Sequence, residues 1–190
     1  PREEDRRPFE DVMRAELAIR NGAVLDGTGS PERRLDVGIR AGKIAGIGSD
    51  IEADESYDAR GKVVAPGFID LHTHSDLPLI NDGNAESKVR QGVTVDVIGE
   101  STSVAPRDGL TDAKDTWTDF TGYWKALARN GTSMNVISEV SYNQVRLVVM
   151  SYSAGPPTAA QLERMKELTL RSMREGAWGL VTRFESGGPA

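Results

Sequence analysis

The sequence contains no cysteine, and histidine occurs only twice among its 190 residues. The absence of cysteine excludes disulfide bonds, thiolate nucleophiles and zinc sites built on thiolates. Any chemistry that needs an imidazole must use His72, His74 or both. Because these two residues are separated by a single position, they are the first candidates for a functional site.

Long apolar runs and an excess of basic residues are also lacking. No apolar run approaches about 18 residues, so we expect no transmembrane helix and no membrane partner. The charged N-terminus has no apolar region typical of a signal peptide, which leads us to expect a cytoplasmic location. Lys and Arg number 23 against 29 Asp and Glu, and the resulting net charge of −6 argues against a nucleic-acid partner.

What the sequence does contain is typical of a soluble globular protein with one or two domains. Hydrophobic residues make up 38% and charged residues 27% of the chain. Residues 1–15 are mostly charged and are predicted to be a disordered lead-in, within which Met13 is a candidate natural start.

Residues 16–66 are predicted to form a separate, small β-sandwich domain. Residues 17–26 are interpreted as two strands joined by a turn at Asn21-Gly22. Further short strands follow over 35–40 and 44–47 and on either side of Gly61. Short strands at intervals of about ten residues with tight turns between them favour a sandwich.

The pattern changes at Pro66-Gly67 to strands that alternate with helices, which indicates βα units around a parallel sheet. Thr158 and Gln161 form a capping-box pattern at the start of the last helix. Strands are predicted over 68–74, 93–98, 135–140 and 177–184, and helices over 85–91, 115–129 and 158–175.

The strand predicted over 68–74 carries the histidine pair. Side chains two positions apart share a face of a strand, so Asp70, His72 and His74 are expected on one side, with Leu71 and Thr73 on the other. Two imidazoles on one face near the carboxyl end of a strand can bind one divalent metal ion, most often zinc. A purely structural role for the pair stays open on the residues alone.

The stretch around the histidines closely resembles a known family. Residues 64–76, with the sequence VAPGFIDLHTHSD, resemble the first barrel strand of the amidohydrolase superfamily. The resemblance extends from about residue 16 to residue 190. Within the superfamily, the chain is similar to the N-acyl-D-amino-acid deacylase, or D-aminoacylase, branch. The other stretches that carry it are 19–29, 42–48, 86–94, 157–159 and 176–180.

The resemblance implies a (β/α)8 TIM-like barrel enzyme with one or two metal ions, usually zinc. His72 and His74 match the metal-binding His-x-His of the family, and Asp70 then supports and orients them. Deacylases usually carry Gly-Asn-Cys-Gly at the end of the second barrel strand, with the Cys as a metal ligand. This chain has Gly99-Glu100-Ser101 there in a segment one residue shorter, so Glu100 is either the replacement ligand or a solvated loop acid.

A second departure from the branch lies near the end of the chain. Residues 182–189 differ from the Ser-Thr-Gly-Leu type of segment common in deacylases. Arg183 in this segment is a candidate for binding a substrate carboxylate through its guanidinium group. It could equally pair with an acid in the barrel wall.

A βα barrel takes about 250 residues, whereas only about 125 follow the predicted sandwich, enough for about four strands of eight. The remaining family metal histidines and the catalytic aspartate lie on later strands, and no histidine follows His74. The resemblance therefore implies that residues 67–190 are the first half of a hydrolase barrel, with no catalytic residue in this segment. Alone, such a half barrel has two open sheet edges and is expected to be inactive.

The function implied for the full-length protein is metal-dependent hydrolysis of a C–N amide bond. The first candidate is deacylation of a small N-acyl-D-amino acid by a zinc-activated water, and the oligomeric state is left open. A cyclic-amide hydrolase of the hydantoinase or dihydroorotase kind is the alternative within the class. A non-catalytic metal-binding or structural fragment, or a carbohydrate- or peptide-binding β module, are the alternatives outside it.

Overall fold

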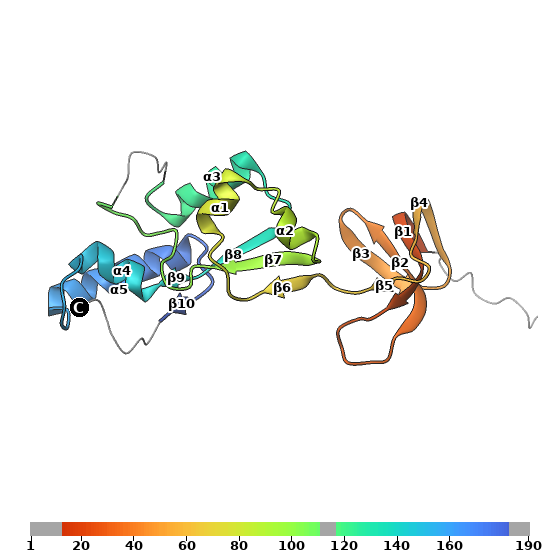
Figure 1. The fold of residues 1–190 in the computed structure, drawn as a ribbon, viewed down its shortest axis with the longest axis horizontal. Coiled ribbons are helices and arrows are strands. Elements are labelled where there is room, and N and C mark those ends of the chain that lie inside the picture. The colour runs from red at the N-terminus through yellow and green to blue at the C-terminus, as the bar shows by residue number, and fades with distance from the viewer. Residues whose placement is uncertain (1–12, 111–116, 183–190) are drawn as a thin grey trace, which may run out of the picture. The chain divides into compact units, whose positions relative to one another are not determined.

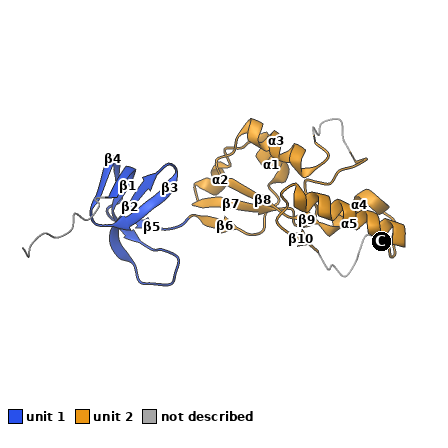
Figure 2. Ribbon diagram, turned by 180° about the vertical axis from the view of Figure 1, so that it is seen from behind, with its two compact units in different colours: residues 1–66 blue, residues 67–190 orange. Residues whose placement is uncertain are grey.

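The structure, a computed structural model, describes residues 13–110 and 117–182. The chain divides into two compact units, residues 1–66 and residues 67–190 (Figure 2). In the first unit the described elements are all strands, and the second alternates strands with helices (Figure 1). The protein is therefore of mixed α/β class. None of the described helices is long and apolar enough to cross a membrane.

The first unit is a five-stranded sheet with β1 at its centre. β1 pairs with β2 in antiparallel and with β4 in parallel orientation, while β3 pairs with β2 and β5 pairs with β1. Ala15, Ala18 and Ile51 form its small buried core. The strands are β1 (Met13–Val24), β2 (Arg33–Arg40), β3 (Lys43–Gly48), β4 (Ile51–Asp58) and β5 (Val63–Val64).

Two expectations for this unit need correction. β1 begins at Met13, so residues 13–15 belong to the sheet and not to the lead-in, whose residues 1–12 lie outside the described part. Asn21-Gly22 is not a hairpin turn but a bulge within one continuous strand. The register there advances by three residues on β1, from Ile19 to Gly22, and by two on β2.

The bulge arises because both halves of β1 have partners on the same neighbouring strand. Asn21 adopts a φ of 62°, its backbone N–H donates to Asp36 Oδ1 at 3.0 Å and its side chain donates to Asp58 at 3.0 Å. A Cβ on Gly22 would lie 2.5 Å from Val64 Cγ2, so this position requires glycine. The positive φ of Asn21 and the close approach of Val64 to Gly22 therefore accompany a bend of the strand without a reversal.

The second unit contains parallel strands whose spatial order follows the chain. β6 pairs with β7 and β7 with β8, all parallel, and β9 pairs in parallel with β10. Only Glu139 separates β8 from β9, and a hydrogen bond from Trp178 N–H to Ser138 O links β8 to the segment that leads into β10. The strands are β6 (Phe68–Asp70), β7 (Val93–Ile98), β8 (Asn135–Ser138), β9 (Val140–Ser141) and β10 (Leu180–Val181).

Helices in this unit follow the strands, as the alternation predicted, but two of them were not predicted. α1 is short and contains Pro78, and α4 is rich in valine, which favours strands in isolation. In α4, Ser141 caps the helix and Val145 and Met150 are buried, so tertiary packing outweighs the local preference. The helices are α1 (Asp76–Asn81), α2 (Glu86–Val89), α3 (Phe120–Asn130), α4 (Tyr142–Met150) and α5 (Ala159–Arg174).

Helix and strand ends differ from the predictions in other places. Within the expected helix over 115–129, of which 115 and 116 lie outside the described residues, α3 begins at Phe120, because the Asp119 side chain accepts the N–H of Gly122 at 2.8 Å and caps the helix there. The capping box of Thr158 and Gln161 is confirmed. β10 is limited to Leu180–Val181 within the expected 177–184, of which 183 and 184 lie outside the described residues.

Candidate metal centre

The two histidines lie in the loop that follows β6 and not on the strand itself, which corrects the prediction of a strand over 68–74. β6 ends at Asp70, whose Oδ1 accepts the backbone N–H of His72 at 3.3 Å. Such an aspartate turn ends a strand by giving the backbone a local partner in place of the ladder. The side chains of His72 and His74 are 66% and 60% exposed.

Glu100 follows β7 at the same end of the parallel sheet. β7 ends at Ile98, and Gly99 has a φ of 102°. A Cβ on Gly99 would lie 2.3 Å from the carbonyl oxygen of Glu139, whose own N–H donates to Ile98 O at 2.9 Å. Glycine is therefore required for this close approach of two backbones, which sets the point where the chain leaves β7 and Glu100 begins the loop.

The structure brings His72, His74 and Glu100 together, with ligand atoms that all lie within 4.8 Å of one another. Glu100 Oε2 lies 3.2 Å from His72 Nε2 and 3.5 Å from His74 Nε2. The two imidazole rings are 5.5 Å apart between centroids and inclined at 75°. Ligand atoms held about 2.0–2.1 Å from one tetrahedral zinc ion are about 3.3–3.4 Å apart, so both imidazole–carboxylate separations fit a shared metal.

Asp70 contacts the histidine loop through the backbone and is otherwise bound to a lysine. Lys88 Nζ donates to Asp70 Oδ2 at 2.6 Å, to Thr73 Oγ1 at 2.9 Å and to Asp96 Oδ1 at 3.0 Å. The hydrogen bond from Lys88 lowers the pKa of Asp70 below its ordinary value. Burial works against the charged form of Lys88, but the hydrogen bonds to Asp70 and Asp96 outweigh it and raise the pKa of the ammonium group.

Sequence reasoning missed Lys88 and Asp96, although one signal was present. Asp96 is the one charged residue in the predicted strand 93–98, and it is fully buried. A buried carboxylate needs a cationic or hydrogen-bonding partner, so a buried strand with one acid predicts such a partner nearby. The identity of the partner could not be predicted, because Lys88 lies in a short helix among other charged residues.

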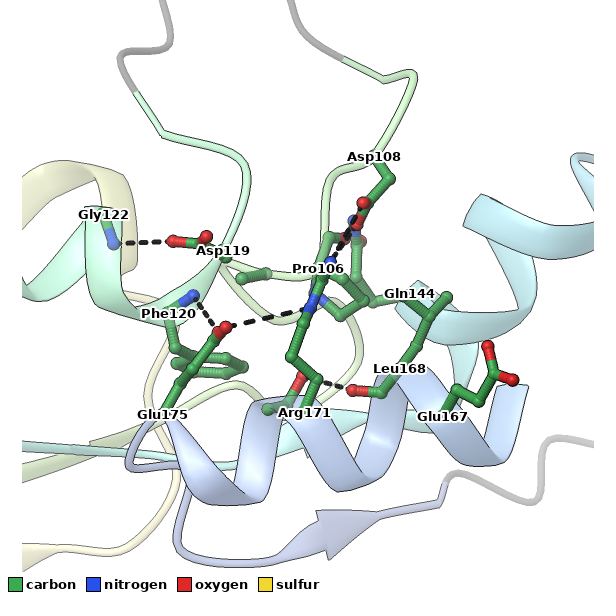
Figure 3. A network of polar contacts seen from close by, with 12 residues as sticks. Pro106, Asp108, Asp119, Phe120, Gly122, Gln144, Glu167, Leu168, Arg171 and Glu175 are labelled. Carbon is green, nitrogen blue, oxygen red and sulfur yellow. Dashed lines mark hydrogen bonds and ion pairs between the residues drawn. The ribbon is translucent and has the colours of Figure 1, made fainter. Parts of the chain in front are cut away.

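The loop that begins with Glu100 is fastened to the helices that follow it (Figure 3). Arg171 on α5 donates to both carboxylate oxygens of Asp108, at 3.1 and 2.5 Å, and Gln144 on α4 donates to Pro106 O at 2.8 Å. The hydrogen bond from Arg171 lowers the pKa of Asp108. Nearer to Glu100, Ser141 Oγ donates to Ser101 O at 2.6 Å. These hydrogen bonds come from β9, α4 and α5, and they attach the loop to the rest of the second unit.

The donor set defines what this site can do chemically. Two imidazole nitrogens and one carboxylate oxygen are ligands that zinc and similar divalent ions accept, and the exposed histidines leave one side of the group open. Arg183, the predicted substrate contact, lies outside the described residues.

Parallel strands joined by helices, with candidate metal ligands at the carboxyl ends of β6 and β7, define the class as an α/β protein with a metal-type site. A sequence profile described as "Amidohydrolase family" matches residues 55–187. The chain therefore belongs to the amidohydrolase family, which confirms the resemblance noted from residues 64–76.

Relatives and solved structures agree with this assignment. The chain is 37% identical to an N-acyl-D-glutamate deacylase of Alcaligenes xylosoxydans xylosoxydans over 92% of this chain and 39% of that protein. It is 33% identical to a D-aminoacylase of the same organism over 94% of this chain and 38% of the relative. The crystal structure of N-acyl-D-glutamate deacylase from Bordetella bronchiseptica, complexed with zinc and a phosphonate inhibitor, superimposes with a TM-score of 0.80 at 35% identity and covers 89% of this chain and 38% of that one. The chain thus spans about two fifths of the length of the relatives it matches.

Proposed function

We propose that this chain forms the metal-binding first half of an enzyme that hydrolyses N-acyl-D-amino acids. The observation that carries the proposal is the convergence of His72, His74 and Glu100 within 4.8 Å at the ends of two adjacent parallel strands. Membership of the amidohydrolase family and the deacylase names of the relatives support the same activity. The substrate is then a small N-acyl amino acid.

The full enzyme is proposed to be a (β/α)8 barrel to which residues 67–190 contribute the first strands. Its support is the order β6, β7, β8 with β9, and β10, in which successive parallel strands are spatial neighbours. A barrel is built in this order, and its active site lies at the carboxyl ends of the strands, where the histidines and Glu100 lie here. Residues 16–66 are proposed to belong to a separate, small β-sandwich domain.

The candidate ligands fit one zinc ion, and the full enzyme is proposed to hold one or two ions. His72 and His74 would bind through Nε2, and Glu100 through a carboxylate oxygen, in the role that the cysteine has in the deacylase branch. When bound, the zinc polarises the amide carbonyl and makes a water molecule a competent nucleophile near neutral pH. Asp70 fixes the backbone of His72 by accepting its N–H, and thereby orients the first ligand.

The remaining chemistry is assigned to residues beyond this segment or beyond the described part. The general base is proposed to be an aspartate on a later strand. Arg183 is proposed to bind the substrate carboxylate. The alternative role is an ion pair with an acidic side chain of the barrel wall. The predictions of a cytoplasmic location and of no nucleic-acid or membrane partner rest on composition alone.

The test is hydrolysis of a panel of N-acetyl-D-amino acids by the full-length protein, followed by release of the free amino acid. Turnover is expected to stop with a chelator and to return with added zinc. His72→Ala is expected to abolish turnover because it removes a ligand, whereas Glu163→Gln, on the exposed surface of α5, is the matched control and should not change it. Turnover that a chelator does not affect, or that survives in His72→Ala, would refute the proposal.

A further inference from the structure

We infer that Thr73, Ser75 and Lys88 are positioning residues for the metal centre, an inference that rests on the proposed metal site. Together with Asp96 they form a closed cycle of hydrogen bonds, called the Lys88 ring below. Lys88 bonds Thr73 and Asp96, Thr73 bonds Ser75 at 3.0 Å, and Ser75 bonds Asp96 at 2.5 Å. The ring thus links the loop after β6 to β7 and α2.

Every donor and acceptor direction in the Lys88 ring can be assigned. The three protons of the Lys88 ammonium go to Asp70, Thr73 and Asp96. Ser75 donates its only hydroxyl proton to the second carboxylate oxygen of Asp96, so Ser75 can only accept from Thr73. Thr73 therefore accepts from Lys88 and donates to Ser75. Because each group has a single direction, the ring has one arrangement and no internal alternative.

Two members of the Lys88 ring, Thr73 and Ser75, alternate along the chain with the candidate ligands His72 and His74. His72 and His74 have side chains that are 66% and 60% exposed, whereas Thr73 between them is 8% exposed. Asp96, which receives the bonds from Lys88 and Ser75, has no exposed surface. Between residues 72 and 75 the loop therefore turns His72 and His74 toward the candidate metal group, and Thr73 and Ser75 toward Asp96.

This alternation gives the Lys88 ring its effect on metal binding. A metal site gains affinity when its ligands are already held in the binding geometry, and the loss of a supporting hydrogen bond beside a ligand commonly costs about 10-fold to 100-fold in metal affinity. More than half of each imidazole side chain is exposed, so packing against the protein does little to hold the rings. Their backbone is held instead by Thr73, Ser75 and the Asp70 contact with His72 N–H.

The experiment compares Thr73→Val with Thr73→Ser in the full-length protein. Valine keeps the size of threonine but removes both ring hydrogen bonds, whereas serine restores the hydroxyl. Thr169→Val is the matched control, because the Thr169 hydroxyl bonds the carbonyl of Met165 in its own helix. Zinc affinity is measured by competition with a chromophoric chelator, and exchange of the backbone amide hydrogens of residues 72–75 is measured in zinc-free protein.

Thr73→Val is expected to weaken zinc binding about 10-fold or more and to speed amide exchange across residues 72–75. Thr73→Ser and Thr169→Val should match the wild type in both measurements. Wild-type zinc affinity in Thr73→Val would overturn the inference, as would loss of affinity in Thr73→Ser equal to that in Thr73→Val. If the wild type binds no zinc, the proposed metal site fails. Amide exchange tests the Lys88 ring separately: exchange in Thr73→Val as slow as in the wild type would show that the ring does not hold the loop.

Discussion

Glu100 carries the charge of the candidate metal centre. The two histidines are neutral when they bind a metal, so the Glu100 carboxylate is the only anionic ligand among the three residues that converge. It lies 3.2 and 3.5 Å from the two Nε2 atoms, and its side chain is 21% exposed.

Glu100→Gln is therefore expected to lower zinc affinity at least about 10-fold, since an uncharged amide replaces the anionic ligand at constant size. Titration of zinc into the full-length protein, monitored by calorimetry, measures the change. Glu163→Gln supplies the control for loss of a carboxylate elsewhere in the same unit. Equal affinity in Glu100→Gln and the wild type would assign Glu100 to the loop surface.

Lys88 is expected to matter for stability as well as for the site. Lys88→Met leaves Asp96, which is fully buried, without its cationic partner. The free energy of unfolding should fall by about 3 kcal/mol or more, the usual cost of breaking a buried ion pair from one side. Urea unfolding measures it, and Lys166→Met, from an exposed pair with Glu163, should cost less than about 1 kcal/mol. Equal losses in the two variants would contradict the assigned role of the buried pair.

At the scale of elements, the sequence predicted the strands and helix starts that depend on local hydrophobic periodicity and on capping residues. The strand over 93–98 and the capping box at Thr158 were predicted correctly. The bulge at Asn21-Gly22 was not, because an Asn-Gly dipeptide can reverse a strand or bend it, and only the shared partner β2 decides which. α4 was missed for a related reason, since packing of its valines outweighs their local preference.

The site was predictable to the same extent. The spacing of His72 and His74, and for Glu100 the resemblance to the deacylase branch, indicated three residues that the structure does bring together. The turn that ends β6 at Asp70, and the contacts of Lys88 with two carboxylates, depend on which segments become spatial neighbours. No local pattern contains that information.

The contact between α5 and the loop of Glu100 gives the stability of the folded protein a testable dependence on pH. Arg171 holds the pKa of Asp108 below its ordinary value of 3.8, so the folded protein binds this proton less readily than the unfolded chain. The stabilisation is therefore present above about pH 4 and is lost as the pH falls through the lowered pKa. The difference in Tm between the wild type and Asp108→Asn should be constant near neutral pH and shrink in more acidic solution.

Thermal unfolding followed by circular dichroism from about pH 6 to about pH 3 measures this difference. Asp54→Asn, at a carboxylate on the exposed strand β4 for which no ion pair is found among the described residues, is the control and should show little difference at any pH. A wild-type advantage over Asp108→Asn that grows as the pH falls would have the wrong sign for this contact.

At the scale of the whole molecule, the chain spans about two fifths of the length of its relatives, and its sheet carries uncovered apolar side chains. Leu71 beside β6 and Trp178 before β10 are each 76% exposed, and Phe68 is 66% exposed. These residues lie at the first and last strands of the parallel order, where a barrel would continue.

The 190-residue chain alone is accordingly expected to hydrolyse no N-acetyl-D-amino acid, even with added zinc. A catalytic zinc needs about three protein ligands and a general base, and this chain offers three candidate ligands without the aspartate proposed on a later strand. The same assay on the full-length protein is the comparison. Turnover by the short chain would show that the base lies within it and would overturn the division of roles proposed here.

The most direct test of the metal centre is a crystal structure of the zinc-loaded full-length protein, with anomalous diffraction collected at the zinc absorption edge. The account predicts an anomalous peak about 2.0–2.2 Å from His72 Nε2, His74 Nε2 and a carboxylate oxygen of Glu100. A zinc-loaded protein whose anomalous peaks all lie away from these three residues would contradict it.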